Sequence, residues 1–184
     1  MTTIISLYAG PGAGKSTSAA GMFFKLKSQN FNVELVTEYV KSFAWEGRQI
    51  YSYDQIYFLG NQIRREAILY GKVDYVITDA PVLFSAYYAQ YNNSTRVANG
   101  IKELVKAHYL DSGQRHKHVL LKRTKPYVQA GRFQNELEAK KIDVGLKDLL
   151  DELEFNYYTS HTSEQALDEL LGKLIPGYER TCQT

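Results

Sequence analysis

The stretch "YAGPGAGKST", residues 8–17, crowds glycine and proline between two segments of different pattern. The apolar, β-branched run before it, "TIISLYA" (3–9), has the composition of a buried strand, and residues 15–29 after it have the pattern of a helix. Glycine loses more backbone freedom on folding than any other residue and stabilises neither neighbouring element. The loop therefore indicates that something must approach bare backbone between a strand and a helix.

The composition of the chain narrows the classes of ligand and partner. The 184 residues, 44% of them hydrophobic, are ordinary for one soluble globular domain spanning 1–184. A net charge of +2 is too small by itself to favour sequence-independent binding to nucleic acid or membrane. No apolar run approaches a membrane span, and the N-terminus lacks signal-peptide features, so we expect a cytoplasmic protein without a membrane partner. The one cysteine, Cys182, excludes an internal disulfide.

Strand-like and helix-like segments alternate along the chain. Strand patterns occupy 3–9, 32–37, 74–80, 117–123 and 155–160, and helix patterns occupy 15–29, 54–70, 95–110, 134–152 and 163–174, with a further helix expected over "VLFSAYYAQY" (82–91). Parallel neighbours need crossover connections, and helices supply them. The sequence thus predicts a three-layer α/β/α fold around a five-stranded parallel sheet.

Residues 9–16 fit the phosphate-binding pattern G-x-x-x-x-G-K-[ST], with Ala9 in the first position. In such a loop the backbone N–H groups cradle a β-phosphate, Lys15 reaches the β and γ oxygens, and the Ser16 hydroxyl ligates Mg²⁺. The alternative, a glycine-rich turn with a surface lysine, does not explain the strand before it and the helix after it. The residues predicted to bind ATP with Mg²⁺ are Gly10, Pro11, Gly12, Ala13, Gly14, Lys15, Ser16 and Thr17.

In the phosphate-loop residues 9–16, the chain resembles the P-loop kinases of the nucleoside and nucleotide kinase superfamily. It is most similar to their small nicotinamide-riboside-kinase-like and phage-encoded AAA-like ATPase branch. The resemblance runs from Ile4 to about Leu174, although only the phosphate loop is highly specific. It implies a P-loop NTPase fold, a short lid over about 124–135, and transfer of the γ-phosphoryl group of ATP.

The resemblance also assigns carboxylates at the ends of two strands. In "LVTEYVKSFAWEG", Glu38 and Trp45 resemble the glutamate and aromatic residue that orient the acceptor hydroxyl, with Tyr39 where the family has proline. In "YVITDAP", Asp79 resembles the Walker-B-type carboxylate that holds Mg²⁺ together with Ser16 or takes part in base work. Both positions end strands of a parallel sheet, where ligands bind. The structural alternatives are a solvated first-turn glutamate at 38 and a helix cap at 79.

In related kinases the helix before the third strand lines the acceptor pocket. Here one stripe of residues 54–70 carries Gln55, Phe58, Gln62 and Arg65, at spacings of three, four and three. Amides, an aromatic ring and a guanidinium suit a base-like or nicotinamide-like ring, so we assign Phe58, Gln62 and Arg65, with Tyr39, to substrate binding. The alternative is a mixed surface face, with the apolar side supplied by Ile56, Leu59, Ile63 and Ile68.

The segment "KRTKPYVQAGRFQ" (122–134) lies where these kinases carry their lid. Arg132 resembles the lid arginine that neutralises the transferred phosphoryl group, with Arg123 and Lys125 as helpers and Arg123 also assigned to ATP. The alternative is a solvated basic loop. In the next helix, Asp143 with Lys147 is interpreted as a surface i,i+4 pair.

Together these residues predict a kinase: Glu38 orients the acceptor, Asp79 manages the metal or the base work, and Lys15 and Arg132 neutralise charge. The acceptor is a nucleoside or nucleotide, nicotinamide riboside, or a hydroxymethylated base in DNA, as in phage members of the family. A DNA acceptor would require one basic groove over 115–132 and strongly salt-dependent affinity. The alternative function is an ATP-driven switch that acts through a protein partner.

Overall fold

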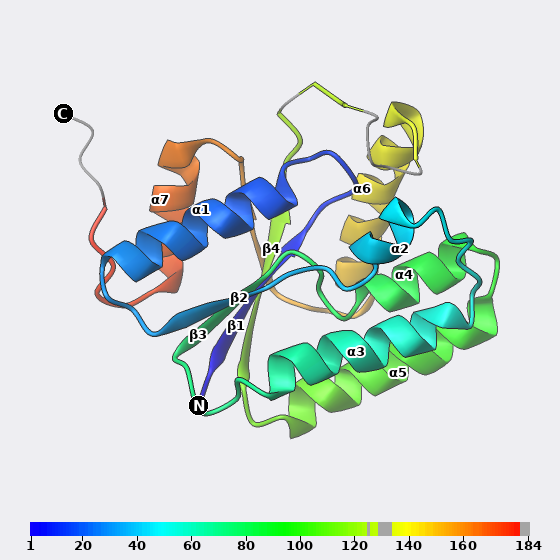
Figure 1. Ribbon diagram of the computed structural model, residues 1–184, viewed down its shortest axis with the longest axis horizontal. Coiled ribbons are helices and arrows are strands. Elements are labelled where there is room, and N and C mark those ends of the chain that lie inside the picture. Colours follow the sequence, from blue (N-terminus) through cyan, green and yellow to red (C-terminus); the bar gives the residue numbers. More distant parts are fainter. Residues whose placement is uncertain (125, 129–133, 181–184) are drawn as a thin grey trace.

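The sheet lies at the centre of the computed structural model, which describes residues 1–124, 126–128 and 134–180 (Figure 1). Its strands run parallel in the order β2-β3-β1-β4-β5. They are β1 (Thr3–Tyr8), β2 (Val33–Val36), β3 (Tyr75–Thr78), β4 (Arg115–Leu121) and β5 (Tyr157–Ser160). The predicted five-stranded parallel sheet is therefore confirmed.

The helices fall where the periodicity predicts them, with one addition. They are α1 (Lys15–Ser28), α2 (Lys41–Trp45), α3 (Asp54–Ala67), α4 (Phe84–Tyr91), α5 (Thr95–Asp111), α6 (Glu136–Glu152) and α7 (Glu164–Leu174). Only α2 has no counterpart among the predicted helices, because its five residues are too few to display a period. The start of α6 is set by a capping box, in which Asn135 and Glu138 satisfy each other's backbone N–H groups.

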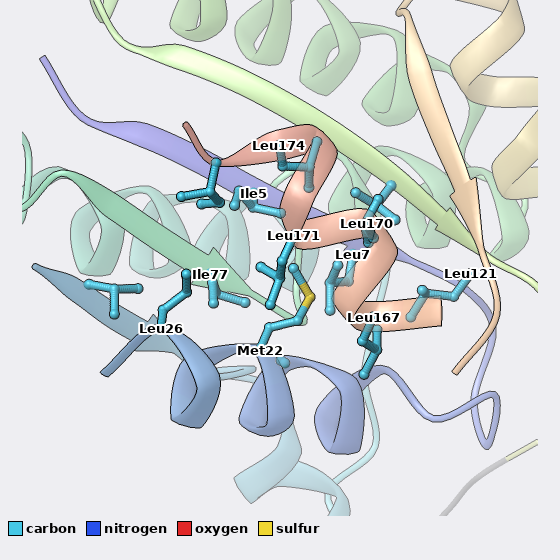
Figure 2. Close-up of a cluster of buried hydrophobic side chains, with 14 of the residues drawn as sticks. Ile5, Leu7, Met22, Leu26, Ile77, Leu121, Leu167, Leu170, Leu171 and Leu174 are labelled. Carbon is cyan, nitrogen blue, oxygen red and sulfur yellow. The ribbon is translucent and has the colours of Figure 1, made fainter. Parts of the chain in front are cut away.

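Helices cover the sheet on both faces, as the three-layer prediction requires (Figure 1). On one face, leucines of α7 and Met22 and Leu26 of α1 pack against Ile5 and Leu7 of β1 (Figure 2). On the other face, residues of α3, α4, α5 and α6 form a second buried cluster with Tyr8. Alternate residues of β1 thus enter opposite cores, and the strand is buried along its whole length.

The parallel arrangement gathers the carboxyl ends of all five strands at one edge of the sheet. The phosphate loop follows β1 there, Glu38 follows β2, and Asp79 follows β3. Arg123 follows β4, and Thr162 follows β5. Residues distant in the sequence are therefore brought to the edge where ligands bind in sheets of this type.

Part of the predicted lid, with Arg132 and Lys125, lies outside the described residues. Within the described ranges, none of the helices is long and apolar enough to cross a membrane.

Candidate active site

The phosphate loop takes a backbone course that glycine makes accessible. Gly12 has a φ of 75° and Gly14 a φ of 101°, both in the left-handed region that other residues avoid. Gly14 is also the N-cap of α1, without a side-chain cap. The first N–H groups of α1 are therefore available to an anion, which the helix dipole further favours.

Lys15 points back across the loop from the first turn of α1. Its Nζ donates to the carbonyl oxygens of Ala9, at 2.7 Å, and Gly10, at 3.3 Å, and lies 5.4 Å from the centre of the Phe84 ring. Burial lowers the pKa of Lys15, while the carboxylates of Glu38 and Asp79 act in the opposite direction. The ammonium thus sits between the loop and two acidic side chains.

Ser16 and Asp79 meet across the edge of the sheet. The Ser16 hydroxyl donates to Oδ2 of Asp79, while Oδ1 is buried without a hydrogen-bond partner. A buried oxygen of this kind is costly unless a ligand satisfies it, and a hydroxyl beside a carboxylate is a donor set that Mg²⁺ accepts. The two side chains therefore fit the predicted metal. The helix-cap alternative for Asp79 is wrong, because α4 has Leu83 as its N-cap and no side-chain cap.

Glu38 lies just beyond β2, near the Lys15 ammonium and the Asp79 carboxylate. Burial raises the pKa of Glu38; the nearby Lys15 ammonium partly offsets this, and Asp79 adds to it. A raised pKa brings a carboxylate closer to the range in which it accepts protons from a substrate. The interpretation as a solvated first-turn glutamate does not fit this partly buried position.

A cavity of about 700 Å³ joins the phosphate loop to the predicted acceptor residues. On the loop side it is lined by Pro11, Gly12, Gly14, Lys15, Ser16 and Thr17. On the other side it is lined by Glu38, Tyr39, Phe58 and Gln62, and by Trp45 of α2. Gly10 and Ala13 are not lining residues, since Gly10 faces α6 and Ala13 is buried in the core.

A family model described as an AAA domain matches residues 4–165 of the chain. The chain belongs to this family. Among solved structures, the AAA domain is similar to the crystal structure of NadR protein in complex with NR, with a TM-score of 0.76 and 12% sequence identity. The match covers 99% of this chain and 54% of the NadR chain, so the AAA domain spans about half the length of that relative. No curated protein sequence matches the chain.

The family and the fold agree with the predicted superfamily. The match to the NadR structure extends over nearly the whole AAA domain and shows the P-loop NTPase fold. Because the identity is low, it shows the fold alone.

Helix α3 turns its polar and aromatic stripe toward the sheet. Gln55, Phe58 and Gln62 are buried, and the Gln62 amide donates to the hydroxyl of Thr78. Ile56 and Ile68 are exposed instead, so the alternative of a mixed surface face for this stripe is wrong. The helix thus supplies polar groups to the cavity.

Arg65 differs from the rest of its stripe. It does not line the cavity of the AAA domain. Its guanidinium lies 4.8 Å from the centre of the Tyr39 ring and donates to the carbonyl oxygen of Thr37. Arg65 therefore packs on the ring of Tyr39 and not in the cavity. A contact between Arg65 and substrate would require the guanidinium to leave this position.

The sequence reasoning missed several cavity residues. Ser85, Tyr88 and Tyr91 of α4 and Arg48 after α2 line the cavity beside the predicted residues. Tyr88 lies close enough to Glu38 for the carboxylate to add to the raised pKa of the phenol. Residues 85, 88 and 91 follow a helical spacing, so the sequence shows that they lie on one face of a helix. Nothing in the sequence indicates that this face of α4 is the one that points to the cavity.

Asp143 is also misplaced by the sequence reasoning. It does not pair with Lys147, which binds Asp151 one turn further along α6. Instead Oδ1 of Asp143 accepts the N–H of Gly10 at 2.6 Å, and Oδ2 accepts Nε of Arg123 at 2.9 Å. The expected surface pair is wrong because α6 packs this turn against the phosphate loop. Arg123, predicted to bind ATP, lies against the loop outside the lining of the cavity.

Proposed function

We propose that this AAA domain transfers the γ-phosphoryl group of ATP to a hydroxyl or phosphate group of a nucleoside-type or nucleotide-type acceptor. The observation that carries the proposal is the shared cavity, which is lined both by the phosphate loop and by Glu38, Tyr39, Phe58 and Gln62. A donor phosphate chain on the loop and an acceptor beside Glu38 would occupy one and the same cavity. Direct transfer between two ligands requires such proximity.

The chemical step assigns a task to each charged side chain. The acceptor oxygen forms a bond to the γ-phosphorus while the bond to the β,γ-bridging oxygen breaks and ADP leaves. Glu38 accepts the proton of the acceptor hydroxyl, for which its raised pKa is suited. Lys15 offsets negative charge on the phosphate oxygens, and Arg132, outside the described residues, is proposed to do so from the lid. Mg²⁺ held by Ser16 and Asp79 would neutralise phosphate charge.

The walls of the acceptor side favour a planar ring. Phe58, Tyr39, Trp45 and Tyr91 supply aromatic faces, and Gln62 supplies an amide. Rings stack on such faces while amides hydrogen-bond their edges. The similarity of the fold to NadR, solved in complex with NR, supports an acceptor of this size and kind. Free nucleosides, nucleotides and a hydroxymethylated base in DNA all carry the required hydroxyl or phosphate next to a ring.

An acceptor screen tests the proposal. The purified protein is given Mg²⁺ and ATP labelled at the γ-phosphate, together with nucleosides, nucleoside monophosphates, nicotinamide riboside, or DNA with and without hydroxymethylated bases. Label on one acceptor class is expected, and Lys15→Ala should abolish it while leaving the circular dichroism spectrum unchanged. With DNA as acceptor, affinity should fall steeply as salt rises.

Release of label only as free phosphate, from every acceptor mixture, would contradict the proposal. That outcome would favour the ATP-driven switch acting through a protein partner. An active, well-folded Lys15→Ala variant would contradict the assignment of the site.

A further inference from the structure

The carboxylate of Asp143 joins two segments that are far apart in the sequence. One oxygen accepts the backbone N–H of Gly10, where the phosphate loop begins, at 2.6 Å. The other accepts Nε of Arg123, just beyond β4, at 2.9 Å. Because both oxygens are engaged, the position of the guanidinium is fixed relative to the loop.

Arg123 is left with two donors that have no partner among the described residues. Its Nε binds Asp143, but Nη1 and Nη2 are buried and make no hydrogen bond. These nitrogens lie against the loop, because a Cβ atom built on Gly10 would be 3.3 Å from Nη2 and one on Gly12 would be 3.4 Å from Nη1. Buried donors of a cation are costly to leave unsatisfied, so an anionic partner here would be strongly favoured.

We propose that Asp143 is a positioning residue for nucleotide binding. It holds Gly10 of the phosphate loop and presents the two terminal nitrogens of Arg123 to a phosphate group of the nucleotide. The proposal rests on the proposed function only as far as the binding of ATP, and it requires no particular acceptor.

Hydrogen bonds at Gly10 connect the pair to Lys15. The N–H of Gly10 is held by Oδ1 of Asp143, while its carbonyl oxygen accepts Nζ of Lys15 at 3.3 Å. Gly10 therefore lies between the Asp143–Arg123 pair and the lysine that is predicted to reach the β and γ oxygens. A phosphate chain bound at Lys15 would lie near the same two charges.

The aromatic ring of Tyr127 lies beside the guanidinium of Arg123. This ring lies against Gly12, at 2.9 Å from a Cβ atom built there, and its centre is 5.9 Å from Cζ of Arg123. The ring and the guanidinium thus lie next to the same residue of the phosphate loop. The hydroxyl of Tyr127 donates to the carbonyl of Gln134, just before the N-cap of α6, so a hydrogen bond links the ring to the segment that leads into the helix.

The affinity for ATP of variants in which one charged side chain is replaced by a neutral one tests the proposal. Asp143→Asn keeps an oxygen for the Gly10 N–H but removes the charge that orients Arg123, and Arg123→Gln removes the guanidinium. Each should raise the Kd for ATP with Mg²⁺ about tenfold in calorimetric titrations, as expected for loss of one charge-assisted contact. The double variant should bind no more weakly than the weaker single variant, because the two residues act as one unit.

The matched control is Asp148→Asn, which makes the same substitution at an exposed position of the same helix and should leave the Kd unchanged. Urea unfolding of each variant separates binding from folding. Unchanged affinity in Asp143→Asn, or a loss of stability without a loss of affinity, would overturn the proposal. Additive effects in the double variant would also overturn it. Since no acceptor is present, the result is independent of whether the protein proves to be a kinase or a switch.

Discussion

Gly10 shows that one residue can serve two requirements at once. Gly10 lies in a loop whose glycines let a phosphate approach the backbone, yet the space beside its own Cα atom is filled by α6. A Cβ atom there would be 2.4 Å from the carbonyl oxygen of Ala139 and 2.9 Å from Oδ1 of Asp143. The backbone of α6 can approach the loop only because residue 10 has no side chain.

Replacement of Gly10 by alanine should therefore cost stability. The clash is with backbone, which cannot yield as a flexible side chain can, and overpacking of this kind costs about 1–3 kcal/mol. Gly60→Ala is the matched control, because Gly60 lies inside α3 with open space around it, and alanine there should add about 0.5–1 kcal/mol. Urea unfolding of both variants measures the difference, and a stable Gly10→Ala variant would show that α6 does not press on the loop.

Glu38 carries the second prediction at this scale. Glu38→Gln removes the proton acceptor but keeps the shape of the side chain, so phosphoryl transfer should fall by about 10²–10⁴-fold while the Kd for ATP stays unchanged. In the wild type, kcat/KM should rise with pH through a pKa above 4.5, since burial raises the pKa of Glu38. Glu103→Gln, at an exposed position on α5 outside the cavity lining, serves as control. Full activity of Glu38→Gln would remove Glu38 from the chemistry.

At the level of elements, α3 shows where prediction from sequence succeeds and where it stops. Its start at Asp54 and its stripe of Gln55, Phe58 and Gln62 follow from a period of 3.6 residues, although the helix ends at Ala67, before the predicted end at residue 70. The direction of that stripe does not, because the isoleucines on the other side are equally plausible core residues by composition. What decides it is the tertiary environment, in which the Gln62 amide has a hydroxyl partner on β3.

The same helix buries a carboxyl group, Glu66, which makes stability depend on pH. Burial raises its pKa to about 8, whereas its usual value is 4.5. Between these values the folded state holds a proton that the unfolded state has lost, so the free energy of unfolding falls as pH rises, by up to about 1.4 kcal/mol per pH unit. Glu66→Gln removes this dependence and should gain stability relative to the wild type from pH 5 to pH 8.

Urea unfolding at pH 5, 6.5 and 8 measures that gain. Glu103→Gln, at an exposed position on α5, should follow the wild type at every pH. Parallel stability curves for wild type and Glu66→Gln would show that Glu66 is ionised in the folded state.

Over the whole molecule, the sequence indicates the residues that short, local patterns can mark. The phosphate loop, Glu38 and Asp79 all follow recognisable strands, and the order of a parallel sheet brings them together without further information. Asp143 could not be found in this way, since 133 residues separate it from Gly10 and its pattern on α6 equally suits a surface pair. Its role depends on where α6 packs, which is a property of the fold as a whole.

Binding of ATP should stabilise the entire chain. A ligand that binds only the folded state raises the free energy of unfolding by RT ln(1 + [L]/Kd), about 2.7 kcal/mol at a hundredfold excess over Kd. Thermal unfolding with and without ATP and Mg²⁺ should therefore show a higher Tm with ligand. Lys15→Ala should lose most of this shift, and an equal shift in that variant would place the nucleotide elsewhere.

The two sides of the cavity are attached to strands that differ in how completely they are paired in the sheet. The phosphate loop continues β1, which is paired on both sides. Glu38 and Tyr39 continue the four-residue β2, which pairs with β3 alone in the part of the chain that the structure describes. Local unfolding starts where pairing is sparse, so β2 should open in excursions that leave β1 in place. In those excursions the chain would still hold a nucleotide but would have lost the groups that position an acceptor. If the proposed function holds, donor recognition would be the more robust property of the fold, and acceptor recognition the more readily altered by mutation.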